Sequence, residues 1–127
     1  MKIFIIDDDE ISIFFTERSL QMGGFEAQIQ TFLSAQEALN KLRNTHLKDL
    51  PDIIFLDLNM PHVNGWEFLE SFKQLSQEKA LEKCLIYILT SSLDISDIDK
   101  AYGNQLVKGY IHKPISLEDI QAIIHLN

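Results

Sequence analysis

Short polar clusters follow the apolar runs of this sequence, and their residue types suit phosphoryl chemistry. Asp7 and Asp8 follow the first run, Asp57 the third and Thr90 the fourth, while Lys113 lies near the end of the fifth. Carboxylates gathered in one pocket repel one another unless a divalent cation neutralises them. Oxygen ligands favour Mg²⁺, which is commonly held by one or two carboxylates together with phosphate oxygens. The pattern therefore predicts a magnesium site in which the Lys113 ammonium and the Thr90 hydroxyl meet a phosphoryl group.

Asp57 is the candidate phosphoacceptor. It ends an apolar run that predicts a central strand, and a polar turn from Pro61 to Gly65 follows it. A carboxylate in that place can attack phosphorus and form an acyl phosphate. Asp9 has a different expected role, because an aspartate directly before a helical pattern accepts hydrogen bonds from the first helical turn.

Strands and helices must alternate along the chain to bring these residues together. Apolar residues at helical spacing, such as Ile11, Phe14 and Phe15 in the first case, follow each of the expected strands, which are 3–6, 25–30, 53–56, 85–89 and 107–111. This alternation predicts an α/β fold with a parallel sheet covered by helices on both faces.

The composition of the strands predicts their order. The first, third and fourth are continuously apolar, as expected for strands buried on both faces, whereas the second and fifth carry polar residues and are expected at the edges. The order 2-1-3-4-5 follows, and its topological switch point lies between strands one and three. Ligand chemistry is therefore expected at the carboxyl ends of those two strands.

Composition and charge describe a folded domain without affinity for nucleic acid or membranes. The chain has 127 residues, of which 46% are apolar and 24% charged, so a single domain over residues 1–127 is expected. The net charge of −8 disfavours binding to nucleic acid or to anionic membranes. No apolar run reaches membrane-spanning length, and a single cysteine, Cys84, permits no internal disulfide, so a cytoplasmic location is expected.

The motifs together resemble the receiver domain of two-component response regulators. They occur in family order and cover essentially the entire chain: Phe4-Ile5-Ile6-Asp7-Asp8, Phe55-Leu56-Asp57-Leu58-Asn59-Met60-Pro61, Leu89-Thr90-Ser91, and Lys113-Pro114 with Tyr110 three residues before the lysine. The resemblance implies a flavodoxin-like fold of five strand-helix units in three layers.

The resemblance also implies a reaction and its ligands. Asp57 would be phosphorylated by a histidine kinase or a histidine phosphotransfer protein. Mg²⁺ would be held by Asp7, Asp8, Asp57 and the backbone carbonyl of Asn59. The Lys113-Pro114 peptide bond would be cis.

The family is a switch, and the resemblance implies how this chain would act as one. Thr90 and Tyr110 would shift when phosphate arrives, and the face formed by helix four, strand five and helix five would change its affinity for an unidentified downstream protein. Asn59 and Ser92 stand at positions that vary in the family and influence the lifetime of the phosphoryl group. Because the chain stops after the fifth helix, we expect a stand-alone regulator without an output domain, as a monomer or weak dimer.

Two other functions share part of this pattern. Asp7-x-Asp9 with the later Lys113 also resembles haloacid-dehalogenase-type phosphatases, in which the first aspartate is the nucleophile and the second a general acid. Those enzymes need further acidic metal ligands after the lysine, where this chain offers Glu118 and Asp119 at a helix start. A flavodoxin-type flavin carrier shares the fold class, but the aspartates after the first strand would repel the flavin phosphate. A switch that catalyses only its own phosphorylation and dephosphorylation is expected, rather than an enzyme.

The remaining candidate side chains are given structural roles. Trp66 is expected to pack rather than to form a cofactor platform, and Cys84 is expected to be buried where the fourth strand begins. No metal-ligand spacing relates the histidines, which are His46, His62, His112 and His125.

Overall fold

A computed structural model describes residues 1–126 and contains one five-stranded parallel sheet. The strands are β1 (Lys2–Ile6), β2 (Gln28–Phe32), β3 (Ile53–Leu56), β4 (Leu85–Thr90) and β5 (Val107–His112). The helices are α1 (Glu10–Met22), α2 (Ala35–Asn44), α3 (Gly65–Leu75), α4 (Ile95–Tyr102) and α5 (Leu117–Leu126), and a short 3₁₀ turn, η1, covers Leu47–Asp49. The sheet order is β2-β1-β3-β4-β5, which confirms the predicted order and the flavodoxin-like fold class.

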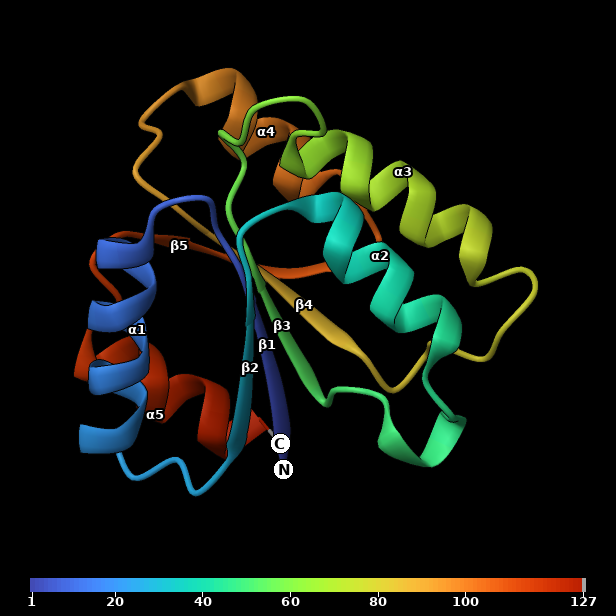
Figure 1. Ribbon diagram of the computed structural model, residues 1–127. Coiled ribbons are helices and arrows are strands. Elements are labelled where there is room, and N and C mark those ends of the chain that lie inside the picture. Colours follow the sequence, from blue (N-terminus) through green and yellow to red (C-terminus); the bar gives the residue numbers. More distant parts are fainter. Residues whose placement is uncertain (127) are drawn as a thin grey trace.

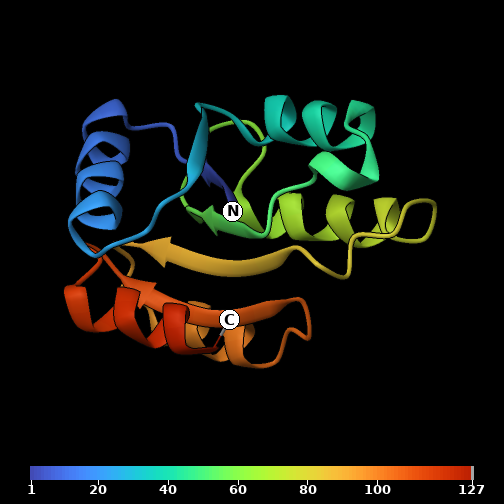
Figure 2. The same cartoon turned by 90° about the horizontal axis from the view of Figure 1, so that it is seen from below.

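The sheet is the middle of three layers. Helices α1 and α5 cover one face, and α2, α3 and α4 cover the other (Figures 1 and 2). A hydrophobic core lies on each face of the sheet, and alternate residues of β1 face one core or the other. Ile3 and Ile5 pack toward α1 and α5, whereas Phe4 and Ile6 pack toward α2 and α3. A central strand buried on both faces must therefore be apolar throughout, which explains the continuous runs in the sequence.

Strand β2 differs from its prediction. The alternation of apolar and polar residues suggested residues 25–30, but the strand begins at Gln28 and ends at Phe32. Its register explains the shift, because β1 begins at Lys2 and Lys2 lies opposite Gln28. Residues before Gln28 have no neighbouring strand to pair with, although Phe25 is buried against the core on the α1 side.

Helix α1 forms where it was predicted, but its apolar residues are not all in the core. Ile11, Phe14 and Phe15 are 68%, 57% and 60% exposed. The buried face of the helix consists of Ile13, Thr16 and Leu20. Two adjacent phenylalanines and an isoleucine thus lie on the solvent side of a helix that begins next to the predicted site.

Among residues 1–126, no helix combines the length and the apolar content needed to cross a bilayer. The single-domain boundary of 1–127 stays a prediction, and its last residue, Asn127, lies outside the described part of the chain.

Candidate functional site

The predicted site residues lie at the carboxyl ends of the central strands. The Asp7 and Asp57 backbone N–H groups each donate one further ladder bond, Asp7 to Phe32 O at 3.0 Å and Asp57 to Ile6 O at 2.9 Å. The Lys113 N–H donates to Thr90 O at 2.8 Å. These bonds extend the sheet by one residue and hold the backbone of the site rigidly.

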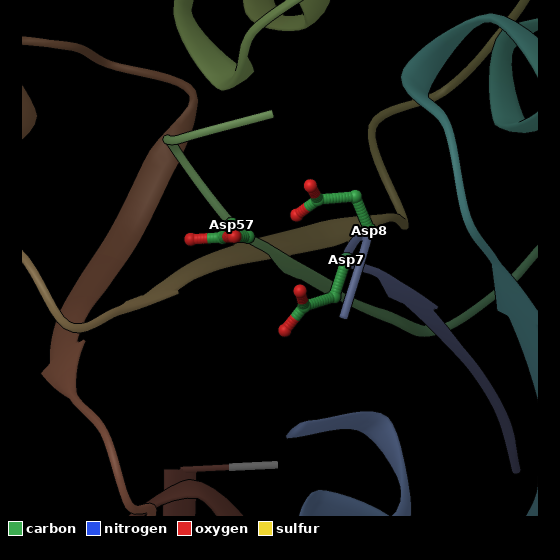
Figure 3. Close-up of side chains that lie close together, drawn as sticks. All are labelled: Asp7, Asp8 and Asp57. Carbon is green, nitrogen blue, oxygen red and sulfur yellow. The ribbon is translucent and has the colours of Figure 1, made fainter. Parts of the chain in front are cut away.

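Asp7, Asp8 and Asp57 form one acidic cluster. Each offers a carboxylate oxygen within 4.8 Å of the others, and the three side chains lie close together (Figure 3). Asp7 and Asp57 are 3% and 6% exposed, whereas Asp8 is exposed. The cluster is thus buried at its base and open to solvent on the side of Asp8.

Asp9 does not belong to this cluster. Its Oδ1 accepts hydrogen bonds from the backbone N–H groups of Ile11 at 3.0 Å and Ser12 at 3.4 Å, which confirms the predicted helix cap. Its own N–H donates to Asp7 Oδ1 at 3.0 Å. The start of α1 therefore also orients the Asp7 carboxylate.

Lys113 supplies the positive charge of the site. Its Nζ lies 2.7 Å from Asp7 Oδ2 and 3.7 Å from Asp57 Oδ2, with its side chain 19% exposed. The Lys113-Pro114 peptide bond is cis, which confirms the isomer that the resemblance implied. The ammonium thus stands between two carboxylates at the point where an additional anion would arrive.

The pKa of Asp57 is raised from 3.8 to about 6, mainly because the carboxyl is buried. The charge of Asp7 raises this pKa further, while the Lys113 charge, the Asn59 backbone N–H and the Thr90 hydroxyl oppose the rise. Asp57 is therefore ionised at neutral pH but poorly solvated, a state in which a carboxylate gains strongly from a bound cation.

The donor set fits Mg²⁺. It consists of carboxylate oxygens from Asp7, Asp8 and Asp57 with no sulfur or imidazole ligand in the cluster, which suits a hard cation. Lys113 neutralises part of the charge of the three carboxylates and leaves a net negative pocket. Asn59 follows on the exposed side of the loop after Asp57, and the part of its carbonyl in metal binding stays a prediction.

The two predicted switch residues meet at the loop between β4 and α4. Thr90 is fully buried, and its Oγ1 accepts a hydrogen bond from the Ser92 N–H at 3.2 Å. The Tyr110 hydroxyl donates to the Ser92 carbonyl at 2.9 Å. Ser92 therefore connects the residue beside Asp57 with an aromatic residue on β5.

The loop after Asp57 is shaped by its predicted turn residues. The Gly65 N–H donates to Leu58 O at 3.0 Å, and the Pro61 carbonyl accepts from the Val63 N–H at 2.8 Å. Between them His62 adopts a left-handed conformation with φ of 67°. The sequence indicated a turn here, but it did not show how closely Gly65 approaches the Asp57 backbone.

The acidic residues that a dehalogenase-type phosphatase would need have other partners. The Ser116 hydroxyl accepts from the Asp119 N–H at 3.0 Å, and Asp119 Oδ2 accepts from the Ser116 N–H at the same distance. Ser116 thus caps α5, and Asp119 at the third helical position completes a reciprocal capping box. Two of the acidic residues of the phosphatase pattern, Asp9 and Asp119, are therefore held at helix starts by hydrogen bonds from backbone N–H groups.

Comparison with known proteins agrees with this geometry. The family model for the response regulator receiver domain matches residues 3–125. A two-component response regulator from Cytophaga hutchinsonii has a crystal structure that superposes with a TM-score of 0.89 at 32% identity, over 98% of this chain and 94% of that one.

Curated relatives give the same result at the level of sequence. The "Probable methanogenesis regulatory protein FilR2" of Methanothrix harundinacea is 29% identical over 96% of this chain and 77% of its own length. The alkaline phosphatase synthesis transcriptional regulatory protein PhoP of Bacillus subtilis is 30% identical over 95% of this chain, which spans 45% of PhoP. The chain therefore belongs to the family of receiver domains of two-component response regulators, which are switches in phosphorylation-dependent signalling.

Proposed function

We propose that Asp57 accepts a phosphoryl group from a phosphohistidine of a histidine kinase or a histidine phosphotransfer protein. The observation that carries this proposal is the arrangement around Asp57. Its buried carboxylate lies 3.7 Å from the Lys113 ammonium and shares an acidic cluster with Asp7 and Asp8. Asp7, Asp8, Asp57 and the Asn59 carbonyl are the groups that would hold Mg²⁺.

The reaction is a substitution at phosphorus. An Asp57 carboxylate oxygen forms the new P–O bond while the P–N bond of the phosphohistidine breaks, and the imidazole leaves with the electron pair and is protonated. Bound Mg²⁺ would supply charge neutralisation for the phosphoryl oxygens. Lys113 provides a charge-assisted hydrogen bond to one of those oxygens, and the Thr90 hydroxyl donates to another.

The first expected result is a covalent adduct on Asp57. Incubation of the wild type with Mg²⁺ and acetyl phosphate should add one phosphoryl group by intact-mass analysis, and Asp57→Asn should add none. An acyl phosphate persists in mild acid but is cleaved by base and by hydroxylamine. An adduct that survives hydroxylamine, or one that persists in folded Asp57→Asn, would contradict the proposal.

The phosphodonor protein is proposed to dock on α1. The exposed side chains of Ile11, Phe14 and Phe15 form an apolar surface on this helix. Phe15 also lines a groove of about 260 Å³ that reaches Lys113 and Pro114. An apolar surface of this kind, continuous with the site, fits a helix of the donor protein that carries the phosphohistidine.

Phe15→Ala is therefore expected to slow phosphorylation by the protein donor about tenfold in kcat/KM, because an exposed aromatic anchor is lost. Phosphorylation by acetyl phosphate should be unchanged, since the small donor needs no docking surface. The first rate is measured with a histidine kinase that phosphorylates the wild type, and the second with acetyl phosphate alone. Met22→Ala is the matched control, because Met22 is 80% exposed at the far end of the same helix. Equal rates for Phe15→Ala and the control would refute docking at this surface.

The response is proposed to pass through the face formed by α4, β5 and α5. Exposed apolar side chains stand on this side of the molecule as well, namely Ile95 and Tyr102 on α4 and Leu117 on α5, which are 74%, 77% and 56% exposed. Because Tyr110 on β5 contacts the loop that follows Thr90, a shift of Thr90 would reach this face directly. The downstream partner is a protein that reads these side chains.

A further inference from the structure

Ser92 is the meeting point of the loop between β4 and α4. Its N–H donates to Thr90 Oγ1 at 3.2 Å, and its carbonyl accepts from the Tyr110 hydroxyl at 2.9 Å. Its own hydroxyl donates to Asp97 Oδ2 at 2.8 Å and accepts from the Asp94 N–H at 3.2 Å. The position of Ser92 therefore decides whether Thr90 and Tyr110 keep their partners.

Asp97 fixes Ser92 from outside the phosphorylation site. It lies half-buried in the first turn of α4, and its other oxygen, Oδ1, accepts from the Trp66 indole N–H at 3.3 Å. Trp66 belongs to α3, and the Lys100 ammonium lies 5.4 Å from the centre of its ring. One carboxylate thus joins the loop after Thr90 to the helix that follows the loop after Asp57.

The Asp97 side chain is not needed to begin its own helix. Asp94 is the N-cap of α4, and its Oδ1 accepts from the Ser96 N–H and the Ser96 hydroxyl, both at 2.9 Å. Both Asp97 oxygens instead accept from donors outside α4. A carboxylate used in this way holds neighbouring segments together.

The hydrogen bond between Ser92 and Thr90 controls where the Thr90 proton points. A threonine hydroxyl has one proton to donate and two lone pairs that accept. Because the Ser92 N–H occupies a lone pair, the Thr90 proton is directed away from Ser92 and is available on the Asp57 side, where the Thr90 hydroxyl already lowers the pKa of Asp57.

We propose that Asp97 is a positioning residue for the phosphorylated state. Its carboxylate links Ser92 to Trp66, so that the Thr90 hydroxyl is poised to donate to a phosphoryl group on Asp57 and the Tyr110 hydroxyl keeps its acceptor. This inference rests on the proposed role of Asp57 as the phosphoacceptor. It assigns control of that site to a helix whose exposed side belongs to the proposed output face.

The test uses beryllofluoride as a stand-in for the phosphoryl group in the presence of Mg²⁺. Trp66 is the single tryptophan of the chain, so its fluorescence follows the titration directly. In Asp97→Ala the half-saturating beryllofluoride concentration should rise about tenfold, the factor that corresponds to about 1.4 kcal/mol. The half-saturating Mg²⁺ concentration without beryllofluoride should stay within about twofold of the wild type, because Asp97 is not among the carboxylates of the acidic cluster.

Two further variants make the result specific. Asp97→Asn keeps one acceptor oxygen, so its beryllofluoride affinity should lie between those of the wild type and Asp97→Ala. Asp99→Asn is the matched control, because Asp99 is an exposed acidic residue on the same helix, and its affinity should equal that of the wild type.

The outcomes separate this inference from the proposed function. If the wild type binds beryllofluoride and Asp97→Ala binds it equally well, the positioning role is wrong while the phosphoacceptor role stands. A parallel loss of Mg²⁺ affinity would show general loosening of the site and would also overturn the positioning role. A folded wild type that binds no beryllofluoride and gains no phosphoryl group would overturn both. If Asp97→Ala does not fold by circular dichroism, Trp66→Phe decides. Because this variant lacks the fluorophore, isothermal titration calorimetry measures beryllofluoride binding to it and to the wild type, with an expected increase of about threefold in the dissociation constant and no increase as the contrary result.

Discussion

Replacing Asp57 by asparagine is expected to raise the free energy of unfolding of the metal-free protein by about 2 to 3 kcal/mol at pH 7.5. Burial raises the pKa of the Asp57 carboxyl from 3.8 to about 6, and the charge of Asp7 adds to the effect. An ionised carboxylate therefore destabilises the folded state in the absence of a cation. Asparagine keeps the shape of the side chain and removes the charge.

The pH dependence gives the sign of this effect. Well below pH 3.8 the Asp57 carboxyl is protonated in both the folded and the unfolded chain, so the variant should have little advantage there. Between pH 3.8 and about 6 the carboxyl ionises in the unfolded chain while the folded wild type still holds its proton, so stability falls as the pH rises. The loss levels off above the folded-state pKa of about 6. The advantage of Asp57→Asn should therefore grow between pH 4.5 and 7.5.

Urea denaturation in the presence of EDTA measures this difference at pH 4.5, 6 and 7.5. Asp99→Asn is a suitable control, because it removes an exposed carboxylate and should change stability by less than about 0.5 kcal/mol. Equal gains for Asp57→Asn at all three pH values would show that the charge is not the cause. Added Mg²⁺ should stabilise the wild type more than the variant, because one of its proposed ligands is missing in the variant.

The sequence predicted how the principal side chains converge because parallel strands end at the same edge of a sheet. Asp7, Asp57 and Thr90 each follow or end an apolar run, so strand order alone brings them together. Lys113 could be placed in the same way from the end of the fifth strand. The start of β2 could not, because it depends on where β1 begins rather than on the residues of β2 itself.

Sequence patterns could not predict contacts between segments that are distant along the chain. Helical spacing at Ile11, Phe14 and Phe15 predicted a helix correctly, but periodicity does not say which face of that helix meets the sheet. Asp97 was not singled out by any sequence pattern, because an acidic residue in the first turn of a helix is common. Its contact with Trp66 joins residues 31 positions apart and arises only when α3 and α4 pack on the same face of the sheet.

Gly65→Ala is expected to destabilise the fold by about 2 to 4 kcal/mol and to slow phosphorylation of Asp57 by acetyl phosphate at least about tenfold. A Cβ atom at Gly65 would lie 2.6 Å from the Asp57 carbonyl oxygen and 2.9 Å from Leu58 Cα. Both are backbone atoms, so the clash can be relieved only by moving the segment that carries the phosphoacceptor. Stability and the rate of phosphorylation should therefore fall together.

The sign of the change in stability distinguishes the steric clash of a Cβ atom at Gly65 from the effect of helix propensity. Gly65 is the first residue of α3, where alanine would by propensity alone stabilise the helix by up to about 1 kcal/mol. Gly103→Ala is the matched control, because a Cβ there would meet no atom closer than 3.4 Å, and its stability should change by less than about 1 kcal/mol. Thermal and urea denaturation of both variants measure these changes in stability.

A Gly65→Ala variant as stable as the wild type and phosphorylated at the same rate would mean that the loop after Asp57 can shift without moving the carboxylate. A joint fall in stability and in phosphorylation rate would show that the position of the phosphoacceptor depends on having no side chain at residue 65.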